Sequence, residues 1–449
     1  MPLTGKKGCG VVRVLPCSGQ AASPTEGKPR QAEQTLKTIR PPLAGDAFGA
    51  SQALSVVNRG DLCAGCGGCA AMFPHALAMG MEEPGFLRPR QISALPVGAD
   101  EAIAAVCPGL GVTVEAGSRT DDTMWGPYRR AWTGWSMDAS QRHRGASGGA
   151  LTAVLTHLLR SGVVQAVVQN APDPNDPMGN RTVLSADPAT FGTTAGSRYA
   201  PSAPLDALPD ILADGRRVAF VGKPCDAAAL AAIRSRDPVV ARAVPVILSF
   251  FCAGVPSTRG ARGILAALDV AETEVTAFRY RGNGWPGQAT ATLADGSRRS
   301  MSYHDSWGGI LSRHVQHRCK ICADGSGMAA DLVCADAWEV DEKGYPLFEE
   351  REGVSLVLAR TVLGEQIAEG ARAAGRLDLA PFDMTRLMDI QPGQRERRRA
   401  LVARLAALRV LGRPIPAYRG LHLATLSRQL GLLKTVRNFL GMLRRGLRK

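Results

Sequence analysis

The chain is poor in aromatic residues and has no apolar run long enough to cross a membrane. Phe, Trp and Tyr make up 5% of its 449 residues, so a flat, ring-shaped ligand would be held largely by backbone, glycine and polar groups. The longest promising uncharged stretch, 243–258, has 16 residues and two prolines, whereas a spanning helix needs about 20 apolar residues. We therefore expect this stretch to form a buried strand that runs into a loop.

The sequence also lacks several signatures of location and catalysis. Its N-terminus has no apolar segment of the kind that secretory signals carry, and no GxSxG, HExxH or P-loop motif supports hydrolase or kinase chemistry. We predict a cytoplasmic protein. In that reducing compartment, short spacings among its 11 cysteines indicate metal or redox chemistry before disulfides.

Positive charge is concentrated at one end of the chain. The net charge is +14, but the stretch from Arg397 to Lys449 alone contains 14 Lys or Arg and no Asp or Glu. The first 396 residues therefore carry 40 basic and 40 acidic side chains. A balanced body gives no field to attract a polyanion, so we predict that the protein has no nucleic-acid partner.

Composition divides the chain into four predicted segments. The first is rich in proline and lacks any sustained period, so we expect a disordered leader in which Cys9 and Cys17 have no role. A small glycine-rich cysteine module, a main body and a basic helical tail follow. The predicted boundaries are 1–58 for the leader, 59–118 for the module, 124–390 for the body and 395–449 for the tail.

Helical and strand patterns alternate along the body. Short apolar runs bounded by turn residues predict strands within 163–169, 216–222 and 243–251. Residues from Ala150 onward have helical spacing up to Gly162, a residue type that often ends helices. Such alternation is typical of an α/β fold, here with a mixed sheet.

The most specific motif is Cys63-Ala-Gly-Cys66-Gly-Gly-Cys69. Three thiolates at this spacing can hold one corner of an iron–sulfur cluster. A ferredoxin would have a fourth cysteine at position 73, where this chain has Phe73, and in two-cluster ferredoxins that cysteine serves the other cluster. We therefore predict one cluster here, with Cys107 as its fourth ligand. Structural zinc is the alternative, because four thiolates also satisfy Zn²⁺.

A second group of cysteines lies downstream. Cys319 and Cys322 form a Cys-x-x-Cys pair, and Cys225 and Cys252 each follow a predicted strand. Strand ends at one edge of a sheet converge in space, where cofactor sites form in α/β folds. A redox dithiol, zinc and a cluster all fit the pair, and Cys225, Cys252 and Cys334 fit buried structural thiols equally well.

Two glycine-rich loops favour a phosphate-bearing cofactor. Gly145-Ala-Ser147-Gly148-Gly149 precedes a predicted helix, whose N-terminus could bind a pyrophosphate; an ordinary N-cap at Ser147 explains the loop as well. The second loop runs from Arg281 to Gly287 and includes Trp285, which could stack on a planar ring system or simply belong to a tight turn.

These motifs together resemble the coenzyme F420-reducing hydrogenase β-subunit family, which is similar to 7-hydroxymethyl chlorophyll a reductase and the ferredoxin-type divinyl chlorophyllide reductases. The resemblance covers roughly residues 60–360 and includes, in order, LCAGCGGCAAMFP, EEPGFLRP, AVCPG, GASGGALTAVLTHLL, AGSRYAPS, VAFVGKPCDAAAL, SFFCAGVPS, FRYRGNGWPG and HRCKICADGSGMAADLVCADAW. It implies an FAD-containing iron–sulfur oxidoreductase, with a ferredoxin-like module on a mixed-sheet α/β flavin domain.

The resemblance also implies roles for individual residues. One [4Fe–4S] cluster would be held by Cys63, Cys66, Cys69 and Cys107, and a second by Cys225, Cys252, Cys319 and Cys322. Cys334 falls where the family more often has glycine. The residues that match flavin-region motifs or are expected to line the flavin pocket are Ser147, Gly148, Gly149, Ser197, Arg198, Tyr199, Arg281, Asn283, Trp285, Asp324, Asp336 and Trp338.

The function that follows is electron transfer between [4Fe–4S] clusters and FAD, for the benefit of an unidentified substrate or an F420-like deazaflavin. A ferredoxin or a partner redox subunit would supply or accept the electrons. The alternative is a zinc-stabilised, non-catalytic accessory protein in membrane-linked polysaccharide assembly.

The tail suggests a further contact. Leu426, Leu430, Leu433, Leu440 and Leu447 recur at spacings that fit one helical face, among unpaired basic residues. A basic amphipathic helix can lie on an anionic bilayer. We therefore hypothesise peripheral membrane association through residues 420–449, on the inner face of the membrane; a helix packed on the body with a solvated basic face is the alternative.

Overall fold

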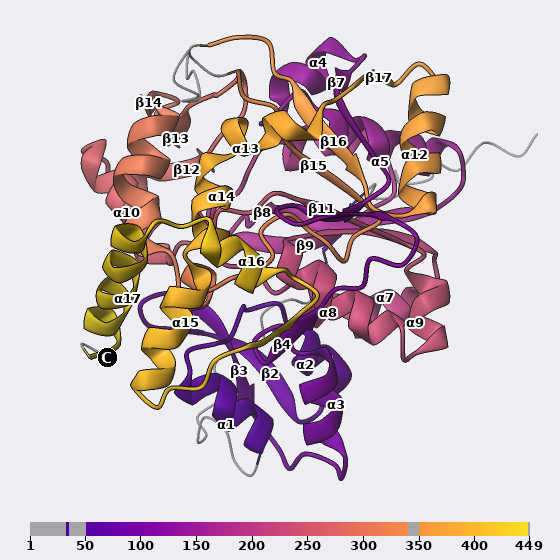
Figure 1. Cartoon of the computed structure of the whole chain (residues 1–449). Helices are drawn as coiled ribbons and strands as arrows, with labels where there is room; N and C mark the ends of the chain where they lie inside the picture. Colours follow the sequence, from indigo (N-terminus) through magenta and orange to yellow (C-terminus); the bar gives the residue numbers. More distant parts are fainter. Residues whose placement is uncertain (1–32, 36–50, 340–349, 448–449) are drawn as a thin grey trace, which may run out of the picture. The chain divides into compact units, whose positions relative to one another are not determined.

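The computed structural model describes residues 33–35, 51–339 and 350–447 (Figure 1). Most of the predicted leader, including Cys9 and Cys17, lies outside this range. Residues 32–449 belong to a single structural unit. The cysteine module, the main body and the tail are therefore parts of one folded body.

Within the described residues, nine strands form the central sheet. Its order is β1 (Glu33–Thr35), β9 (Asn180–Ser185), β8 (Ala166–Pro172), β10 (Val218–Gly222), β11 (Val246–Phe250), β15 (Leu332–Asp336), β16 (Ser355–Ala359), β7 (Arg130–Ser136) and β17 (Leu377–Pro381). Strands β8, β10, β11 and β15 run parallel, whereas their neighbours on both sides are antiparallel. The predicted mixed α/β sheet is confirmed, and each of the three predicted strands overlaps an observed one.

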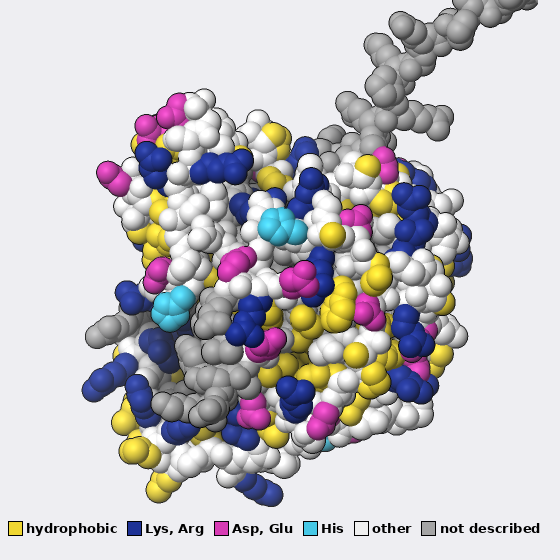
Figure 2. Space-filling model, turned by 90° about the horizontal axis from the view of Figure 1, so that it is seen from above, with side chains coloured by type: hydrophobic (Ala, Val, Ile, Leu, Met, Phe, Trp, Pro, Cys, Tyr) yellow, Lys and Arg dark blue, Asp and Glu magenta, His cyan; other side chains and the backbone are white. Residues whose placement is uncertain are grey.

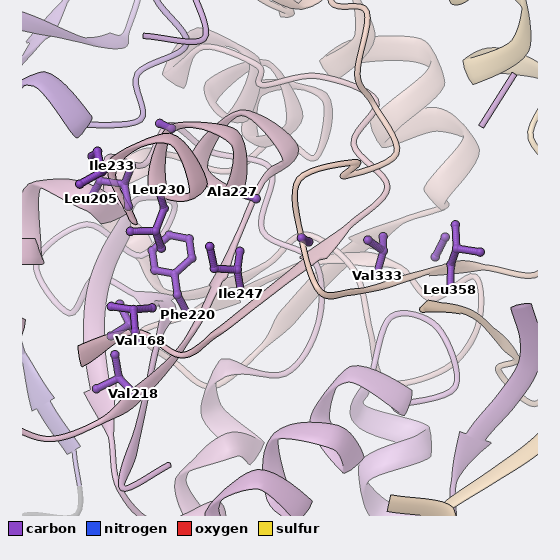
Figure 3. Packing of buried hydrophobic residues seen from close by; sticks show 14 of the residues in the cluster. Val168, Leu205, Val218, Phe220, Ala227, Leu230, Ile233, Ile247, Val333 and Leu358 are labelled. Carbon is purple, nitrogen blue, oxygen red and sulfur yellow. The ribbon is translucent and has the colours of Figure 1, made fainter. Parts of the chain in front are cut away.

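Both faces of the sheet are buried, which explains why its central strands are apolar at successive positions. Along β10, Phe220 belongs to one core cluster and Val221 to the other. Figure 3 shows Phe220 and Ile247 directed toward Leu230 of helix α8 (Pro224–Arg234). Helices α5 (Ala150–Arg160) and α12 (Val362–Ala373) cover the other face. Each fully buried aliphatic or aromatic side chain contributes about 1.5–3 kcal/mol.

The cysteine module consists of short elements around its loop. They are α1 (Gln52–Arg59), α2 (Gly68–Met72), the hairpin of β2 (Leu77–Glu82) and β3 (Phe86–Gln91), α3 (Ala99–Val106) and β4 (Gly111–Thr113). Helix α1 begins inside the predicted leader. Its N-cap Ser51 accepts a hydrogen bond from the backbone N–H of Leu54 and donates one to Asp100 of α3 at 2.5 Å. Residues 51–58, which were predicted to belong to the leader, are therefore part of the folded module.

A three-stranded sheet stands beside the central one. It contains β12 (Val275–Arg279), β13 (Ala289–Leu293) and β14 (Arg298–Met301), packed against α10 (Thr258–Ala267) around Phe278 and Ile264. The loop from Arg281 to Gly287 connects β12 to β13. This sheet therefore supplies one wall of the site described below.

The basic tail packs against the rest of the fold. Helices α14 (Pro392–Arg399) and α15 (Leu401–Val410) are followed by β18 (Ala417–Arg419), which pairs in parallel with β4 of the cysteine module. Two more helices, α16 (Leu423–Arg428) and α17 (Leu432–Leu447), complete it. No helix in the described part of the chain is both long and apolar enough to cross a bilayer. On the face that Figure 2 presents, basic and acidic side chains are interspersed over most of the surface.

Candidate functional site

The structure brings together the four cysteines predicted for the first cluster. Cys63 and Cys66 lie on the loop before α2, Cys69 lies in its first turn, and Cys107 caps the C-terminus of α3. Gly65 and Gly67 take positive φ values of 74° and 85°, which fold the loop back on itself. All four side chains line one small cavity. Burial raises the pKa of each thiol, that of Cys107 to about 11.

The second set also converges, because strands β10 and β11 are parallel neighbours that end at the same sheet edge. Cys225 lies in the first turn of α8, directly after β10, and Cys252 follows β11. Burial raises the pKa of the Cys225 thiol, and the nearby Cys252 and Cys319 raise it further. Burial also raises the pKa of the Cys252 thiol, and Cys319 and Cys322 raise it further. The Sγ atom of Cys319 accepts hydrogen bonds from the N–H of Val255 and from Gln316, both at 3.4 Å.

Cys334 lies apart from both sets. It is the third residue of β15 and is buried in a hydrophobic core cluster. Burial alone raises the pKa of its thiol to about 12, without a contribution from another cysteine. Of the roles left open by the sequence, the structure favours that of a buried structural thiol.

Two arginines beside the cysteines, buried Arg318 and half-buried Arg397, have buried N–H donors without an acceptor among the described residues. Arg318 donates through Nη2 to the carbonyl of Pro108, next to Cys107, at 2.6 Å, while its Nε and Nη1 have no hydrogen-bond partner in the described part of the chain. Arg397 donates to the carbonyl of Cys252 at 2.8 Å, and its Nε has no partner there either. Because a buried donor without an acceptor lowers the stability of the fold, these groups fit a site that holds a negatively charged group. Clusters ligated by four thiolates carry such charge.

The two cysteine sets are joined by direct contacts. Gln316 donates through Nε2 to Cys319 and to the carbonyl of Ala64, the residue after Cys63, each at 3.4 Å. Arg318 precedes Cys319 and contacts Pro108. In the part of the chain that the structure describes, no group of three or more His, Cys, Asp or Glu side chains is arranged to hold a single metal ion. An iron–sulfur cluster is larger than a single metal ion, so its ligands surround a larger volume.

A cavity of about 300 Å³ lies next to the second set. It is enclosed by the loop before α5, the segment 194–200, the ends of β10 and β11, and residues that follow β12 and β15. Of the residues predicted to contact a flavin, those that line this cavity are Ser147, Gly149, Ser197, Arg198, Tyr199, Arg281, Asp336 and Trp338. The remaining four, Gly148, Asn283, Trp285 and Asp324, do not line it.

An ion pair with stacked rings forms one wall of the cavity. Buried Arg281 makes two hydrogen bonds to the carboxylate of Asp336, at 2.7 and 2.8 Å, and its guanidinium lies 4.9 Å from the centre of the nearest Trp338 ring. Burial alone would lower the pKa of Arg281, but Asp336 raises it. Trp285 donates to Asp336 at 2.8 Å and stacks on Trp338 with ring centres 4.9 Å apart. Trp285 therefore supports the wall from behind.

The glycine loop before α5 does not cap the helix through Ser147. Gly149 is the N-cap, and Ser147 instead donates through Oγ to the carbonyl of Ala335 at 3.0 Å. Gly148 and Gly149 have φ values of 60° and 68°, and a Cβ at Gly148 would lie 2.9 Å from the carbonyl of Gly353. The N-cap interpretation of Ser147 is wrong. The first N–H groups of α5, which no helical carbonyl satisfies, adjoin the cavity.

Two other predicted residues have structural partners. The guanidinium of Arg198 donates to Asn180 Oδ1 at 2.6 Å and to the carbonyl of Gly179 at 2.6 Å, so it ties the cavity wall together. Buried Asp324 accepts hydrogen bonds from the backbone N–H groups of Ser326, Gly327 and Met328. Its place is in the loop after Cys322, and the prediction that it lines the cavity is corrected.

Sequence reasoning missed Lys223. This buried residue lines the cavity, and its Nζ contacts Asp226 at 2.8 Å and Ser202 Oγ at 2.9 Å. Burial alone would lower the pKa of Lys223, but Asp226 and Cys225 raise it. The available signal was a lysine between a strand and a candidate ligand, in VGKPCD.

Arg144 and Arg279 were also missed. A side chain at Gly192 would collide with Arg144, and a Cβ at Gly196 or Gly282 would lie 2.9 Å from Nη1 of Arg279. Burial and the neighbouring Arg144 lower the pKa of Arg279. Within the described residues, neither arginine has an acidic partner. The glycines thus make room for two like charges close to the cavity-lining residues Ala195 and Gly196.

Comparison with known proteins places this architecture in a family of redox-enzyme subunits. Residues 131–209 match the family described as coenzyme F420 hydrogenase/dehydrogenase, beta subunit N-term, and residues 215–385 match the corresponding C terminus. The two matches together span more than half of the chain. The protein belongs to the coenzyme F420 hydrogenase/dehydrogenase β-subunit family. The cysteine module and the basic tail lie outside the matched ranges.

Among solved structures, the chain is similar to one from the F420-reducing [NiFe] hydrogenase complex of Methanosarcina barkeri, studied as a xenon derivative. The two share 19% sequence identity at a TM-score of 0.48, and the match covers 63% of this chain and 96% of that chain.

Proposed function

We propose that this protein is an iron–sulfur flavoprotein oxidoreductase that passes electrons between two [4Fe–4S] clusters and FAD. The observation that carries the proposal is the position of Cys252. It belongs to the second cysteine set and also lines the 300 Å³ cavity. A cofactor in the cavity would therefore share a wall with that set, and Gln316 and Arg318 continue the contacts to the first set.

The residues of the cavity fit a flavin dinucleotide. A flavin exchanges electron pairs with substrates and single electrons with clusters, which lets it link the two kinds of chemistry. Trp338 and Tyr303 provide flat surfaces for a ring system, with ring centres 6.0 Å apart. The start of α5 and the glycine loop before it offer backbone N–H groups to phosphate.

We assign the diphosphate end of the dinucleotide to the side of Arg144 and Arg279. Both lie beside the segment that contains Ala195 and Gly196, and neither has an acidic partner within the described residues. Arginine binds phosphate through paired N–H donors, so two guanidinium groups without an acidic partner among the described residues favour a doubly charged ligand.

The proposal extends to a substrate and to partners. A cavity that must also accommodate a flavin leaves the substrate at its open side, and an F420-like deazaflavin is one ring system of suitable shape. A ferredoxin or a partner redox subunit would exchange electrons at the cysteine module. Reduced thiols are kept in the cytoplasm, so we place the protein there.

Binding measurements on the purified protein test the flavin assignment. We expect Arg144→Gln with Arg279→Gln to weaken FAD binding at least tenfold, because two phosphate-binding cations are lost. Riboflavin, which has no phosphate, should bind the variant as well as it binds the unaltered protein.

The matched control is Arg313→Gln with Arg386→Gln, which removes two exposed charges from other parts of the surface. Flavin fluorescence quenching reports both ligands. Equal loss of FAD and riboflavin would overturn the phosphate assignment, and absence of any flavin binding to the unaltered protein would overturn the proposed function.

A further inference from the structure

Helix α17 is fixed to the body along one side. Met442 is fully buried, and Phe439 and Leu443 pack into the same core cluster. Gly446 fits against Leu411 at the end of α15, and Asn438 accepts a hydrogen bond from Arg404 of α15 at 3.1 Å. Figure 1 shows the two helices side by side. The helix therefore does not need its other apolar side chains for packing.

Those other side chains form an exposed apolar strip. The side chains of Leu432, Leu433, Val436, Leu440 and Leu447 are 81%, 83%, 45%, 48% and 70% exposed. From Leu433 onward, their spacings of three, four and seven residues keep them on one helical face. We call these five residues the outer strip. A monomeric protein rarely leaves so many large apolar side chains together in water unless they bind something.

Two of the five leucines that the sequence-based hypothesis assigned to this face do not belong to it. Leu426 and Leu430 are 1% and 7% exposed and pack against the body. The chain turns at 429–431, between α16 and α17, so the single helical face predicted from Leu426 to Leu447 is interrupted. Only the part from Leu432 onward is available to a partner.

Positive charge lies alongside the outer strip. Arg437, Arg444 and Arg445 are exposed and have no acidic partner within the described residues, whereas Lys434 faces Glu396 at 3.5 Å. Arg437 and Arg444 each lie three residues from one strip residue and four from another, so they flank the strip. Arg445 is two residues from Leu447 and five from Leu440, so it lies farther round the helix. No acidic residue occurs anywhere after Glu396. A partner for this surface must therefore combine negative charge with an apolar interior.

We propose that the outer strip inserts into the surface of an anionic phospholipid bilayer, with Arg437 and Arg444 at its phosphate groups. A helix with one apolar face and flanking cations binds at this depth without spanning the membrane. The structure also gives the contact a consequence. Arg404, which holds α17, donates through Nη1 to the carbonyl of Lys320 at 2.8 Å, between Cys319 and Cys322. Membrane binding would thus bring the second cysteine set toward the lipid surface.

Vesicle flotation of the full-length protein tests this proposal. We expect flotation with phosphatidylcholine vesicles that contain phosphatidylserine, and little with phosphatidylcholine alone. Leu433→Ser with Leu440→Ser should reduce binding at least tenfold, because two inserted side chains are lost. Arg437→Gln with Arg444→Gln should reduce it about fivefold for each cation removed, and high salt should mimic that loss.

The control is Val239→Ser with Val362→Ser, since these side chains are 51% and 53% exposed on other helices. It should float like the unaltered protein, and all variants should melt at the same temperature, because no buried side chain is changed. Deleting residues 420–449 would be a poor substitute, since it would remove the buried Met442.

Two results would overturn the proposal. One is equal flotation of the outer-strip variant and its control. The other is a protein that ignores vesicles but is dimeric in solution, as measured by light scattering, and becomes monomeric when Leu433 and Leu440 are replaced. The strip would then be an interface between two copies of the chain.

Discussion

Arg318 is the residue that most directly relates the two cysteine sets. It is buried between them and donates one hydrogen bond to the carbonyl of Pro108. Its guanidinium carbon lies 5.8 Å from the centre of the Tyr418 ring. Burial alone would lower the pKa of Arg318, but Tyr418 and the thiols of Cys322 and Cys225 raise it. The side chain is therefore a permanent positive charge next to both proposed clusters.

Replacing Arg318 by leucine should make the reduction potentials of the clusters more negative. A reduced cluster carries one more negative charge, and at an effective dielectric of about 20 a unit charge about 4–8 Å away contributes about 2–4 kcal/mol, which is on the order of 100 mV. Redox titration followed by electron paramagnetic resonance measures the shift. Arg318→Lys keeps the charge and should change the potentials less. Unchanged potentials in Arg318→Leu would contradict the assignment.

At the scale of elements, the loop from Arg281 to Gly287 and the end of β15 depend on each other. Arg281 is 2% exposed, and Asp336 provides its counter-charge. Removing one partner of a buried ion pair typically costs about 3–5 kcal/mol, because the remaining charge is left uncompensated. An exposed pair contributes about 0–1 kcal/mol.

We therefore expect Asp336→Asn to lower the free energy of unfolding by about 3 kcal/mol and to reduce flavin retention. Glu272→Gln, which breaks the exposed pair of Glu272 with Arg262, is the control and should cost less than about 1 kcal/mol. Urea denaturation measures both. Adding Arg281→Met to Asp336→Asn should recover part of the stability. If Asp336→Asn costs no more than Glu272→Gln, the ion pair does not hold the wall.

Several elements could be predicted from the sequence because their signals are local. The apolar run at 216–222 and the helical spacing from Ala150 each report a buried strand or helix face without reference to the rest of the chain. The two faces of α17 could not be distinguished in that way. A helical period shows which apolar residues share a face. Whether Leu430 or Leu433 is buried depends on where the chain turns and on which side chains of α15 face α17. The start of α1 was missed because its cap partner, Asp100, lies far along the sequence.

At the scale of the whole molecule, the candidate site is assembled from distant parts of the chain. The first set of cysteines could be found from the sequence because its spacing is specific, whereas Cys225 and Cys252 were assigned to the second set from the family resemblance. Lys223, Arg144 and Arg318 could not be found in this way. Their importance comes from burial or from missing partners, and only the fold determines both. Asp324 shows the opposite case. It lies within a motif that matches the family, but its side chain accepts hydrogen bonds from the backbone of its own loop.

The central claim is that the chain carries two iron–sulfur clusters and a flavin, and one measurement tests it most directly. Protein purified without oxygen should contain about eight irons per chain and one flavin, with a broad absorption shoulder at about 400 nm beside the flavin bands. Cys63→Ala should retain the flavin and lose about four irons, whereas Cys334→Ser should lose none. Zinc in place of iron, with no flavin bands in the visible spectrum, would contradict the account.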